Sequence, residues 1–360
     1  MATTPDSCSV YCGCYQPQGR EGLFHLRFDL ETGRMGLQGA LSGVANPSFL
    51  ALRPDGRALY AASEAPGGAG GEVCAFGRDP RSGDLAPLNR QGAHGRATCH
   101  VSLAAGGRYL LATNYAGPTI ALYPVRADGG LEPAAAVVRH EGSGVHARQA
   151  EPHPHSATPD PSGRFVYCPD LGIDRVQIYR LDATAGALLP ADPPGVGTAP
   201  GAGPRHLEFH PRLPYAYLVN ELDSTVVAYA WEAASGALRS LQVSGALPAD
   251  FRGESTGADI HVHPGGRFVY ASNRGHDSIA VFGLDADSGR LTPLGHHGSG
   301  GRTPRNFALH PGGAWLLAAN QGSDALASFA VDAATGRLEP TGHSLSLPAP
   351  ACVVFARAGG

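Results

Sequence analysis

Hydrophobic and polar residues alternate along most of this chain in short runs that end at a glycine, a proline or an acidic residue. One such run, Leu23–Asp29, leads into a turn at Gly33, and the same phrase returns before six later glycines. These are Gly83, Gly129, Gly186, Gly236, Gly289 and Gly336, so successive turn glycines lie 46 to 57 residues apart. Alternation with a period of two indicates strands buried on one side, and a glycine turn between two strands predicts a β-hairpin.

A second phrase precedes the first in each period and also predicts a hairpin. Clear copies are Pro54–Tyr60, Pro161–Tyr167 and Pro264–Tyr270, and weaker copies start at Ala105, Pro211 and Pro311. An apolar run lies on each side of the Pro/Gly turn. Two hairpins per period make four short strands, and four-stranded units that repeat radially are the blades of a β-propeller.

The two ends of the chain complement each other. The first phrase has seven copies and the second has six, so one hairpin is missing from the interior of the sequence. Ala351–Phe355 matches the apolar run Cys99–Leu103, and Ser9–Cys14 supplies a strand that pairs with it. We therefore predict one all-β domain over residues 1–360: a seven-bladed β-propeller with four antiparallel strands per blade and one blade closed by the N- and C-terminal strands. An open solenoid has no need for matching ends.

Composition narrows the chemistry further. The sequence has no lysine, so all 27 basic residues are arginine, which excludes a Schiff-base lysine. A net charge of −4 without a basic cluster argues against nucleic acid as a partner. No apolar run approaches the ~20 residues of a membrane helix, and residues 1–7 lack the pattern of a signal peptide. We expect no membrane partner, a cytoplasmic location and seven free cysteines.

Aligning the blades on their turns identifies three columns of residues at one end of the central channel. The position that opens the inner strand is occupied by Ser48, Cys99, His155, Arg205, Ala258, Arg305 and Ala351. The position that ends the next strand is occupied by Cys14, Ser63, Asn114, Asp170, Asn220, Asn273 and Asn320, and is followed by Tyr15, Glu64, Tyr115, Leu171, Glu221, Arg274 and Gln321. The Asn-rich column favours a repeated structural turn. The other two columns break the repeat with charged and aromatic residues, which favours an asymmetric ligand over a solvated rim.

The longest period adds a loop, 139–149, at the same end of the channel, and long loops are often binding loops. Three histidine pairs are candidate metal ligands: His153/His155, His261/His263 and His296/His297. We expect His261 and His263 at the far end of their strand, and no triple of ligands stands at metal-binding spacing. We therefore expect no metal and no cofactor.

Several segments carry a resemblance to a known family over essentially the whole chain. They are Asn46–Leu50, Pro152–Ser156, Gly203–His206, Val219–Ser224, Ala258–Val262 and Ser272–Ser278. These motifs resemble the propeller-type 6-phosphogluconolactonase family, which includes the fungal carboxy-muconate lactonizing enzymes on the same seven-bladed fold. The family's active-site His, two Arg and Glu fall on His155, Arg205, Arg274 and Glu221, all within the irregular columns.

The resemblance implies a hydrolase acting on a carboxylic ester: a lactonase that opens a small-molecule sugar lactone, 6-phosphogluconolactone in the pentose phosphate pathway. Glu221 would be the general base, with Arg274 keeping it ionised. His155 or Arg205 would donate to the oxyanion, and Arg305 would hold the phosphate. The remaining candidates would bind substrate: Glu64, Asn114, Tyr115, Gln321 and His100, the last being equally a paired core histidine.

Two other functions stay open at this point. One is a muconate-type lactonizing isomerase, in which the arginines hold carboxylates and Glu221 or His155 moves the proton. The other is a non-catalytic propeller that binds proteins, although an exposed aromatic patch is the signature of such a surface and only 7% of the residues are aromatic. The sequence does not determine the lactone or the oligomeric state.

Overall fold

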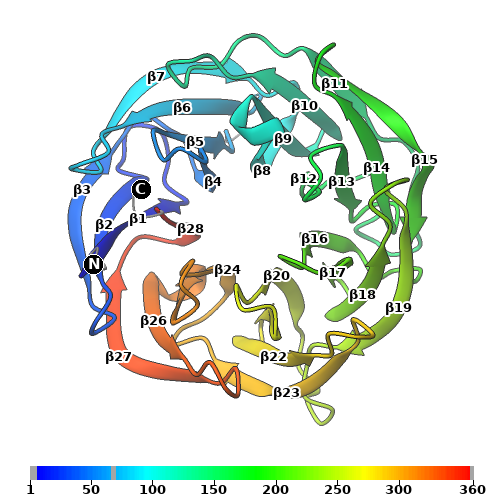
Figure 1. The fold of residues 1–360 in the computed structure, drawn as a ribbon. Coiled ribbons are helices and arrows are strands. Elements are labelled where there is room, and N and C mark those ends of the chain that lie inside the picture. The colour runs from blue at the N-terminus through cyan, green and yellow to red at the C-terminus, as the bar shows by residue number, and fades with distance from the viewer. Residues whose placement is uncertain (1–5, 66–69, 357–360) are drawn as a thin grey trace.

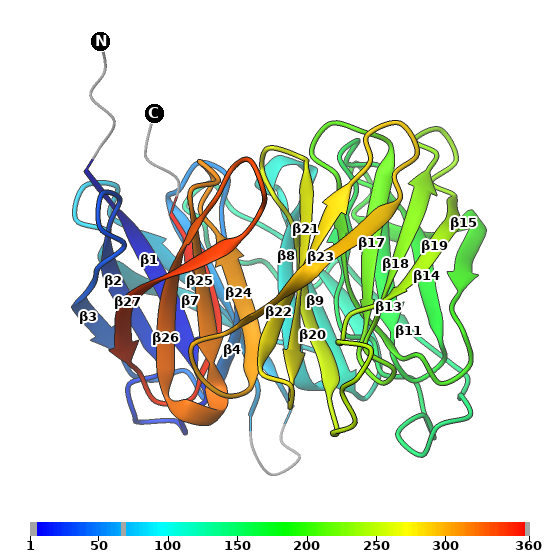
Figure 2. The same cartoon turned by 90° about the horizontal axis from the view of Figure 1, so that it is seen from below.

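The alternating runs form strands, and the turn residues between them form the connections. A computed structural model describes residues 6–65 and 70–356, and this part of the chain contains seven four-stranded antiparallel sheets. Figure 1 shows the sheets arranged around a central axis, and in each sheet one edge strand lies nearest to that axis. Figure 2 shows the same strands from the side, running along that axis. The predicted seven-bladed β-propeller is confirmed.

The strands of each blade are given from the inside outward. The first three blades are β28 (Pro350–Phe355), β1 (Ser7–Cys14), β2 (Leu23–Asp29) and β3 (Met35–Leu41); β4 (Pro47–Leu52), β5 (Ala58–Ser63), β6 (Glu72–Arg78) and β7 (Leu85–Gly92); and β8 (Arg96–Ala104), β9 (Tyr109–Ala116), β10 (Thr119–Pro124) and β11 (Ala136–Arg139). The next two are β12 (Thr158–Pro159), β13 (Phe165–Asp170), β14 (Arg175–Asp182) and β15 (Ala187–Gly197); and β16 (Pro204–Phe209), β17 (Tyr215–Asn220), β18 (Thr225–Trp231) and β19 (Leu238–Gly245). The last two are β20 (Thr256–Val262), β21 (Phe268–Arg274), β22 (Ser278–Leu284) and β23 (Leu291–Gly298); and β24 (Pro304–Leu309), β25 (Trp315–Asn320), β26 (Ala325–Val331) and β27 (Leu338–Ser346).

Two short 3₁₀ turns, η1 (Ala105–Gly107) and η2 (Gln321–Ser323), complete the regular structure of the described residues. The described part of the chain contains no helix that is long and apolar enough to cross a membrane.

The closing blade combines both ends of the chain, as the repeat count predicted. β1 pairs with β2 on one side and with the C-terminal β28 on the other, with Cys12 opposite Val353. Phe28 and Phe355 pack edge to face in this blade, with ring centroids 5.4 Å apart. Because this blade takes its innermost strand from the opposite end of the chain, the two chain ends are joined by β-pairing and the blades form a closed ring instead of a linear array with open ends.

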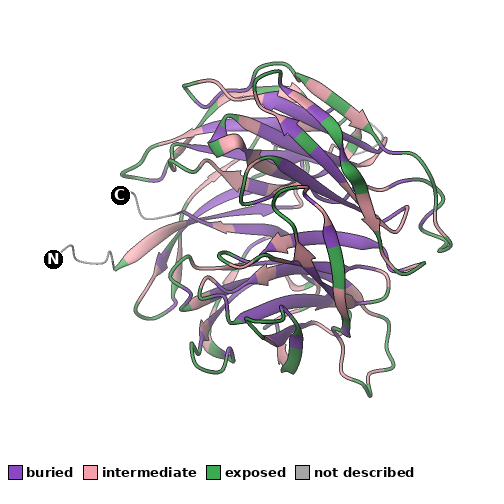
Figure 3. Ribbon diagram, turned by 45° about the vertical axis from the view of Figure 1, so that its right-hand side comes forward, coloured by how far each residue is buried: buried purple, intermediate pink, exposed green. Residues whose placement is uncertain are grey.

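The seven turn glycines explain the spacing of the repeat. All have positive φ, from 66° at Gly186 to 91° at Gly129, a conformation that L side chains rarely adopt. At Gly236 an added Cβ would also lie 2.7 Å from the ring of Phe165 in the neighbouring blade. Tyrosines of the second strands connect the blades at this level: Tyr217 Oη donates to the carbonyl of Gly289 (3.1 Å) and Tyr270 Oη to that of Gly336 (2.8 Å). Apolar residues between adjacent sheets are buried, and exposure is concentrated on loops and outer strands (Figure 3).

The register of the two inner strands places the three sequence columns at one end of the channel. Pro204 pairs with Asn220, Pro304 with Asn320 and Pro47 with Ser63, and in each case the ladder shifts directly after this pair. The residue at the shift is Arg205, Arg305 or Ser48. A β-bulge at this position bends the strand and redirects the side chain. The side chains at the shift therefore do not follow the alternation between the two faces of the sheet that the rest of the strand shows.

One blade departs from the expected pattern. Its inner strand β12 contains only two residues, so His155 precedes the strand instead of opening it. An isolated bridge between Pro154 and Asp170 preserves the expected register. The prolines at 152, 154 and 159 have no N–H to donate to a ladder, which accounts for the short strand.

Candidate active site

Glu221 is the centre of a charged cluster at this end of the channel. It follows β17, and its backbone N–H donates to the carbonyl of Gly203 (2.7 Å). Its Oε2 accepts a hydrogen bond from Arg205 Nε (2.9 Å) and forms an ion pair with Arg274 Nη2 (3.1 Å). Its Oε1 forms an ion pair with Arg148 Nη2 (2.7 Å). We call these residues, together with His155, the Glu221 cluster.

The electrostatics of Glu221 follow from burial opposed by three cations. Only 4% of its side chain is exposed. Burial alone would raise the pKa of Glu221, but Arg274, Arg205 and Arg148 outweigh that effect and lower it to about 2. Burial and then the nearby Arg274 lower the pKa of Arg205 to about 10, which still leaves Arg205 charged at neutral pH. The cluster therefore contains an ionised carboxylate among ionised guanidinium groups.

His155 stands beside this ion cluster as an uncharged ring. Its Nε2 lies 3.8 Å from Glu221 Oε2. Burial, and then the charge of Arg205, hold the pKa of His155 well below its usual value. Two buried nitrogens of the cluster, His155 Nδ1 and Arg274 Nε, have no hydrogen-bond partner within the described residues. Buried polar groups are nearly always paired, so the protein by itself leaves this cluster incompletely satisfied.

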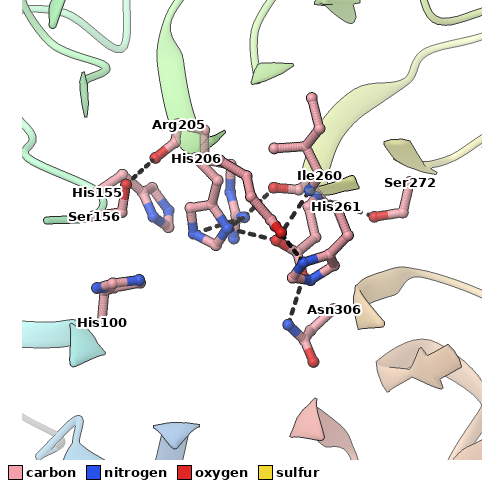
Figure 4. Close-up of polar contacts among 12 residues, drawn as sticks. His100, His155, Ser156, Arg205, His206, Ile260, His261, Ser272 and Asn306 are labelled. Atoms are coloured by element: carbon pink, nitrogen blue, oxygen red, sulfur yellow. Dashed lines mark hydrogen bonds and ion pairs between the residues drawn. The ribbon is translucent and has the colours of Figure 1, made fainter. Parts of the chain in front are cut away.

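Arg205 connects the Glu221 cluster to a second charged group deeper in the channel (Figure 4). Its guanidinium Nη1 donates to the carbonyl of Ala258 and to His206 Nε2, 3.2 Å away. The opposite nitrogen of that ring, His206 Nδ1, donates to Asp259 Oδ1 at 2.7 Å. Burial, followed by Arg205, lowers the pKa of His206 to about 4, so the ring is neutral. Asp259 thereby determines which nitrogen of His206 carries the proton and leaves Nε2 to accept from Arg205.

The second group, which we call the Asp259 cluster, consists of Asp259, His206, His261, Glu208 and Asn306. Asp259 Oδ2 accepts from His261 Nε2 (3.1 Å) and from Asn306 Nδ2 (2.5 Å). His261 Nδ1 donates to Glu208 Oε2 at 2.5 Å. Although burial opposes its charge, Asp259 and Glu208 hold the pKa of His261 well above its usual value. Both ring nitrogens of His261 donate to carboxylates, which is the pattern of an imidazolium.

A cavity of about 600 Å³ opens at this deeper end, between the last residues of the inner strands. His261, Glu208 and Asn306 are among its lining residues, together with apolar residues such as Phe307 and Phe355. The prediction that His261 and His263 lie away from the Glu221 end is confirmed. Among the described residues, no group of three or more His, Cys, Asp or Glu side chains could hold a metal ion.

Other predicted site residues surround the Glu221 cluster. Tyr115 Oη accepts from Arg148 Nη2 (3.2 Å), and its ring packs against that of His155 with centroids 5.6 Å apart. The guanidinium carbon of Arg305 lies 5.3 Å from the ring centroid of Tyr15. Tyr15 Oη donates to Glu64 Oε2 at 2.8 Å. Tyr15 was in the columns but was not predicted as a site residue, and its contacts connect Arg305 with Glu64.

Two predicted substrate-binding residues are engaged in structural contacts, and a third, Gln321, lies in a short 3₁₀ turn and stays a prediction. Asn114 is completely buried: Thr98 Oγ1 donates to its Oδ1 (2.7 Å), and its Nδ2 donates to the carbonyl of Ala93 (2.7 Å). The structural interpretation of the Asn column is therefore supported, and we leave Asn114 out of the proposed site. The ring of His100 packs tilted against that of Phe49 with centroids 4.3 Å apart, and its Nδ1 accepts from the backbone N–H of Ala157 at 3.4 Å. In Figure 4 it stands apart from the contacts drawn as dashed lines. Gln321 begins η2, where its backbone N–H donates to the carbonyl of Thr303 (3.0 Å).

Arg148 is the site residue that sequence reasoning missed. It lies in the long segment between β11 and β12, in the loop expected at this end of the channel, and the contact with Glu221 confirms that position. The unusual length of that repeat was the signal. It identified the loop but not the residue, because the loop has no counterpart in the other blades to align with.

Comparisons with known proteins agree with this architecture. A family model described as "Lactonase, 7-bladed beta-propeller" matches residues 9–355. The 6-phosphogluconolactonase of Bacillus subtilis (strain 168) is 37% identical over 345 residues, covering 96% of this chain and 97% of that protein. The 6-phosphogluconolactonase of Formosa agariphila is 34% identical over 299 residues, covering 80% and 82%. The structure of the periplasmic gluconolactonase of Pseudomonas aeruginosa superposes with a TM-score of 0.92 at 36% identity, covering 98% of this chain and 99% of that one.

Proposed function

The chain belongs to the lactonase family of seven-bladed β-propellers, and from that premise we propose that it hydrolyses a sugar lactone, with 6-phosphogluconolactone as its substrate. The observation that carries this proposal is the Glu221 cluster, a buried carboxylate kept ionised by three arginines at one end of the channel. Arg305 adds a further guanidinium nearby, so four arginines surround the two carboxylates Glu221 and Glu64. An excess of guanidinium groups suits a substrate that carries a phosphate and forms an oxyanion during the reaction.

In the proposed reaction, water adds to the lactone carbonyl carbon and the ring C–O bond then breaks. Glu221 accepts a proton from the attacking water and returns it to the ring oxygen as that oxygen leaves. His155, as a neutral ring, and Arg274, through its guanidinium group, donate to the carbonyl oxygen while it carries negative charge. Arg205, which is 2% exposed and bound on both sides, holds Oε2 of Glu221 in place.

The low pKa of Glu221 sets a condition on this reaction. A carboxylate with a pKa of about 2 is a poor proton acceptor, because general bases work best when their pKa lies near the working pH. Both of its oxygens are also occupied by guanidinium N–H groups. Catalysis by Glu221 therefore requires at least one of these contacts to open.

We assign Arg305 to the substrate phosphate as one of its contacts, with Glu64 and Tyr115 contacting sugar hydroxyls. Within the described residues Arg305 makes no ion pair at salt-bridge distance with a carboxylate, in contrast to Arg148, Arg205 and Arg274. Its guanidinium therefore has hydrogen-bond donors left for an anion. The predicted pentose phosphate role follows from this substrate. The cytoplasmic location remains a prediction, since one similar structure is a periplasmic gluconolactonase by name.

A direct assay tests the proposal. Proton release is followed with 6-phosphogluconolactone and with unphosphorylated gluconolactone, each corrected for spontaneous hydrolysis, beside a panel of muconolactones. We expect enzymatic hydrolysis of the sugar lactones, with the higher kcat/KM for the phosphorylated one. Turnover of muconolactones alone would establish the isomerase instead, and no turnover of any lactone would favour the non-catalytic binding propeller.

A further inference from the structure

Arg148 differs from the other two arginines that bind Glu221. Its side chain is 44% exposed, whereas those of Arg205 and Arg274 are 2% and 15% exposed. Arg205 and Arg274 belong to β16 and β21, but Arg148 comes from the long segment between β11 and β12. Its second contact, Tyr115 Oη at 3.2 Å, is to an uncharged group. Arg148 is thus the one of the three that faces solvent and the one with the fewest constraints on its side chain.

The two oxygens of Glu221 are bound unequally. Oε2 is paired with both Arg205 and Arg274, whereas Arg148 is the only hydrogen-bonding or ion-pair partner of Oε1 among the described residues. If Arg148 leaves, Oε1 becomes free while Oε2 still fixes the carboxylate. If Arg205 or Arg274 leaves instead, neither oxygen is freed.

The backbone next to Arg148 is firmly held. Gln149 is fully buried, and its Nε2 donates to the carbonyl of Leu171 (2.8 Å) and to Asp174 Oδ1 (2.7 Å). Its Oε1 accepts from the backbone N–H of His146 at 2.8 Å. A movement of the Arg148 guanidinium therefore needs only side-chain rotation and no opening of the loop.

We propose that Arg148 recognises the anionic group of the substrate, leaving Oε1 of Glu221 for the phosphate and so exposing that oxygen to the attacking water. The role given to Oε1 rests on the proposed lactonase function, whereas the exchange of Arg148 between carboxylate and phosphate does not. A phosphate carries more charge than a carboxylate and accepts two guanidinium N–H groups at once, which favours the exchange. Glu221 loses little by it, because Arg205 and Arg274 remain.

Loss of Arg148 from Oε1 also strengthens Glu221 as a base, since one of the cations that lower its pKa is removed. The charged and titratable groups that face Glu221 are Arg148 and His155 from the segment before β12, Arg205 from β16, Arg274 from β21, Arg305 from β24 and Tyr115 from β9. Of these, Arg148 alone combines direct contact with Oε1 and broad exposure. A phosphorylated substrate would therefore both bind at the site and activate its base.

The first experiment measures ligand binding without catalysis. The Arg148→Met variant is compared with wild type and with Arg139→Met, which removes an exposed arginine at the end of β11. Calorimetric titration uses two probes, 6-phosphogluconate and gluconate. We expect Arg148→Met to bind 6-phosphogluconate roughly 10- to 100-fold more weakly, the loss of a hydrogen bond between charged groups, and gluconate almost unchanged. Equal weakening of both probes, or no weakening of either, would overturn the proposal.

The second experiment measures catalysis with both lactones. In Arg148→Met, kcat/KM for 6-phosphogluconolactone should fall roughly 10- to 100-fold, while kcat for gluconolactone should rise because Oε1 is already uncovered. The acidic limb of its pH–rate profile should move to higher pH than in Arg139→Met. A purely structural Arg148 would lower both activities together. If wild type hydrolyses no lactone, the proposed function fails, and the binding experiment still decides whether Arg148 recognises phosphate.

Discussion

Two buried carboxylates stand in the same central channel and are held by different kinds of side chain. Glu221 is bound by the guanidinium groups of Arg148, Arg205 and Arg274. Asp259 is bound by the imidazoles of His206 and His261 and by the amide of Asn306. Arginine keeps its charge at any ordinary pH, whereas histidine changes its charge near neutrality. The Glu221 cluster therefore keeps its excess of positive charge, while the charge of the Asp259 cluster changes in the pH ranges where His206, with a pKa of about 4, and His261, with a raised pKa, titrate.

The two clusters also differ in what they leave unsatisfied. Asp259 is satisfied by protein groups alone: besides its side-chain partners, the backbone N–H of Ile260 donates to Oδ1 at 3.0 Å. The Glu221 cluster contains the unpaired buried nitrogens of His155 and Arg274. Unpaired polar groups are costly to bury, and a ligand would satisfy them. We infer that the Asp259 cluster positions Arg205 through its contact with His206, and that the Glu221 cluster is where substrate binds.

Replacing the carboxylate of each cluster tests this division, and the largest effect is expected at Glu221. Glu221→Gln keeps the shape of the side chain but cannot take a proton, so kcat should fall by about 10²- to 10⁴-fold. Glu64→Gln is the matched control, a carboxylate at the same end of the channel, and should act mainly by raising KM. Stopped-flow proton release measures both. A Glu221→Gln enzyme within a few-fold of wild-type kcat would remove Glu221 as the base and make His155 the next residue to test.

Asp259→Asn should instead reduce stability more than chemistry. The change leaves His261, held as a cation by Asp259 and Glu208, with one carboxylate partner, and breaking a buried pair typically costs about 3–5 kcal/mol. Urea denaturation of wild type and Asp259→Asn measures the loss. Its kcat should fall less than that of Glu221→Gln, because Asp259 acts only through His206 and Arg205. A variant as stable as wild type would contradict the structural role.

The pH dependence of stability should separate the clusters. The pKa of Glu221 is lowered to about 2, so its contribution is present above its unfolded pKa and is lost as the pH falls toward 2, on the order of 3 kcal/mol. The pKa of His261 is raised, so its contribution is present below pH ~6.5 and is lost as the pH rises through the folded value. Denaturation curves from pH 2 to 9 should show a reduced acid loss for Glu221→Gln and a reduced alkaline loss for Asp259→Asn. Identical profiles for the two variants would contradict the distinction.

Chelation should have the smallest effect of all. In the described residues the histidines of the Asp259 cluster point at carboxylates and at Arg205, and no group of three or more ligands forms a metal site. Lactonase activity after prolonged dialysis against EDTA should therefore equal that of untreated enzyme. Activity that is lost and then restored by a divalent cation would show that metal binds one of the clusters.

The fold was predictable because its signals are local and repeated. Each turn needs a residue that tolerates positive φ, and glycine marks all seven of them, from Gly33 to Gly336. The closing blade was predictable from the missing hairpin, and β1 and β28 pair as expected. His155, Arg205, Glu221 and Arg274 were identified by their departure from the repeat and by a family resemblance, and the structure places them together.

The tertiary structure alone decided which of these residues touch and how strongly. Register shifts after Pro204 and Pro304 place Arg205 and Arg305 at bulges, and the pattern of apolar residues carries no sign of a bulge. Asn114 and Glu64 occupy neighbouring columns, yet their side chains have different partners. The amide of Asn114 is bound by Thr98 and by the carbonyl of Ala93, whereas Glu64 accepts from Tyr15 beside the Glu221 cluster. Arg148 is almost 60 residues from Arg205 in sequence, in a loop without a repeat, and its contact with Glu221 depends on how that loop folds back. Periodicity determines which strands form, because the alternation of apolar and polar residues within one segment is enough to indicate a strand that is buried on one side. The charge balance around Glu221 depends on side chains from several blades, and only packing brings those side chains together.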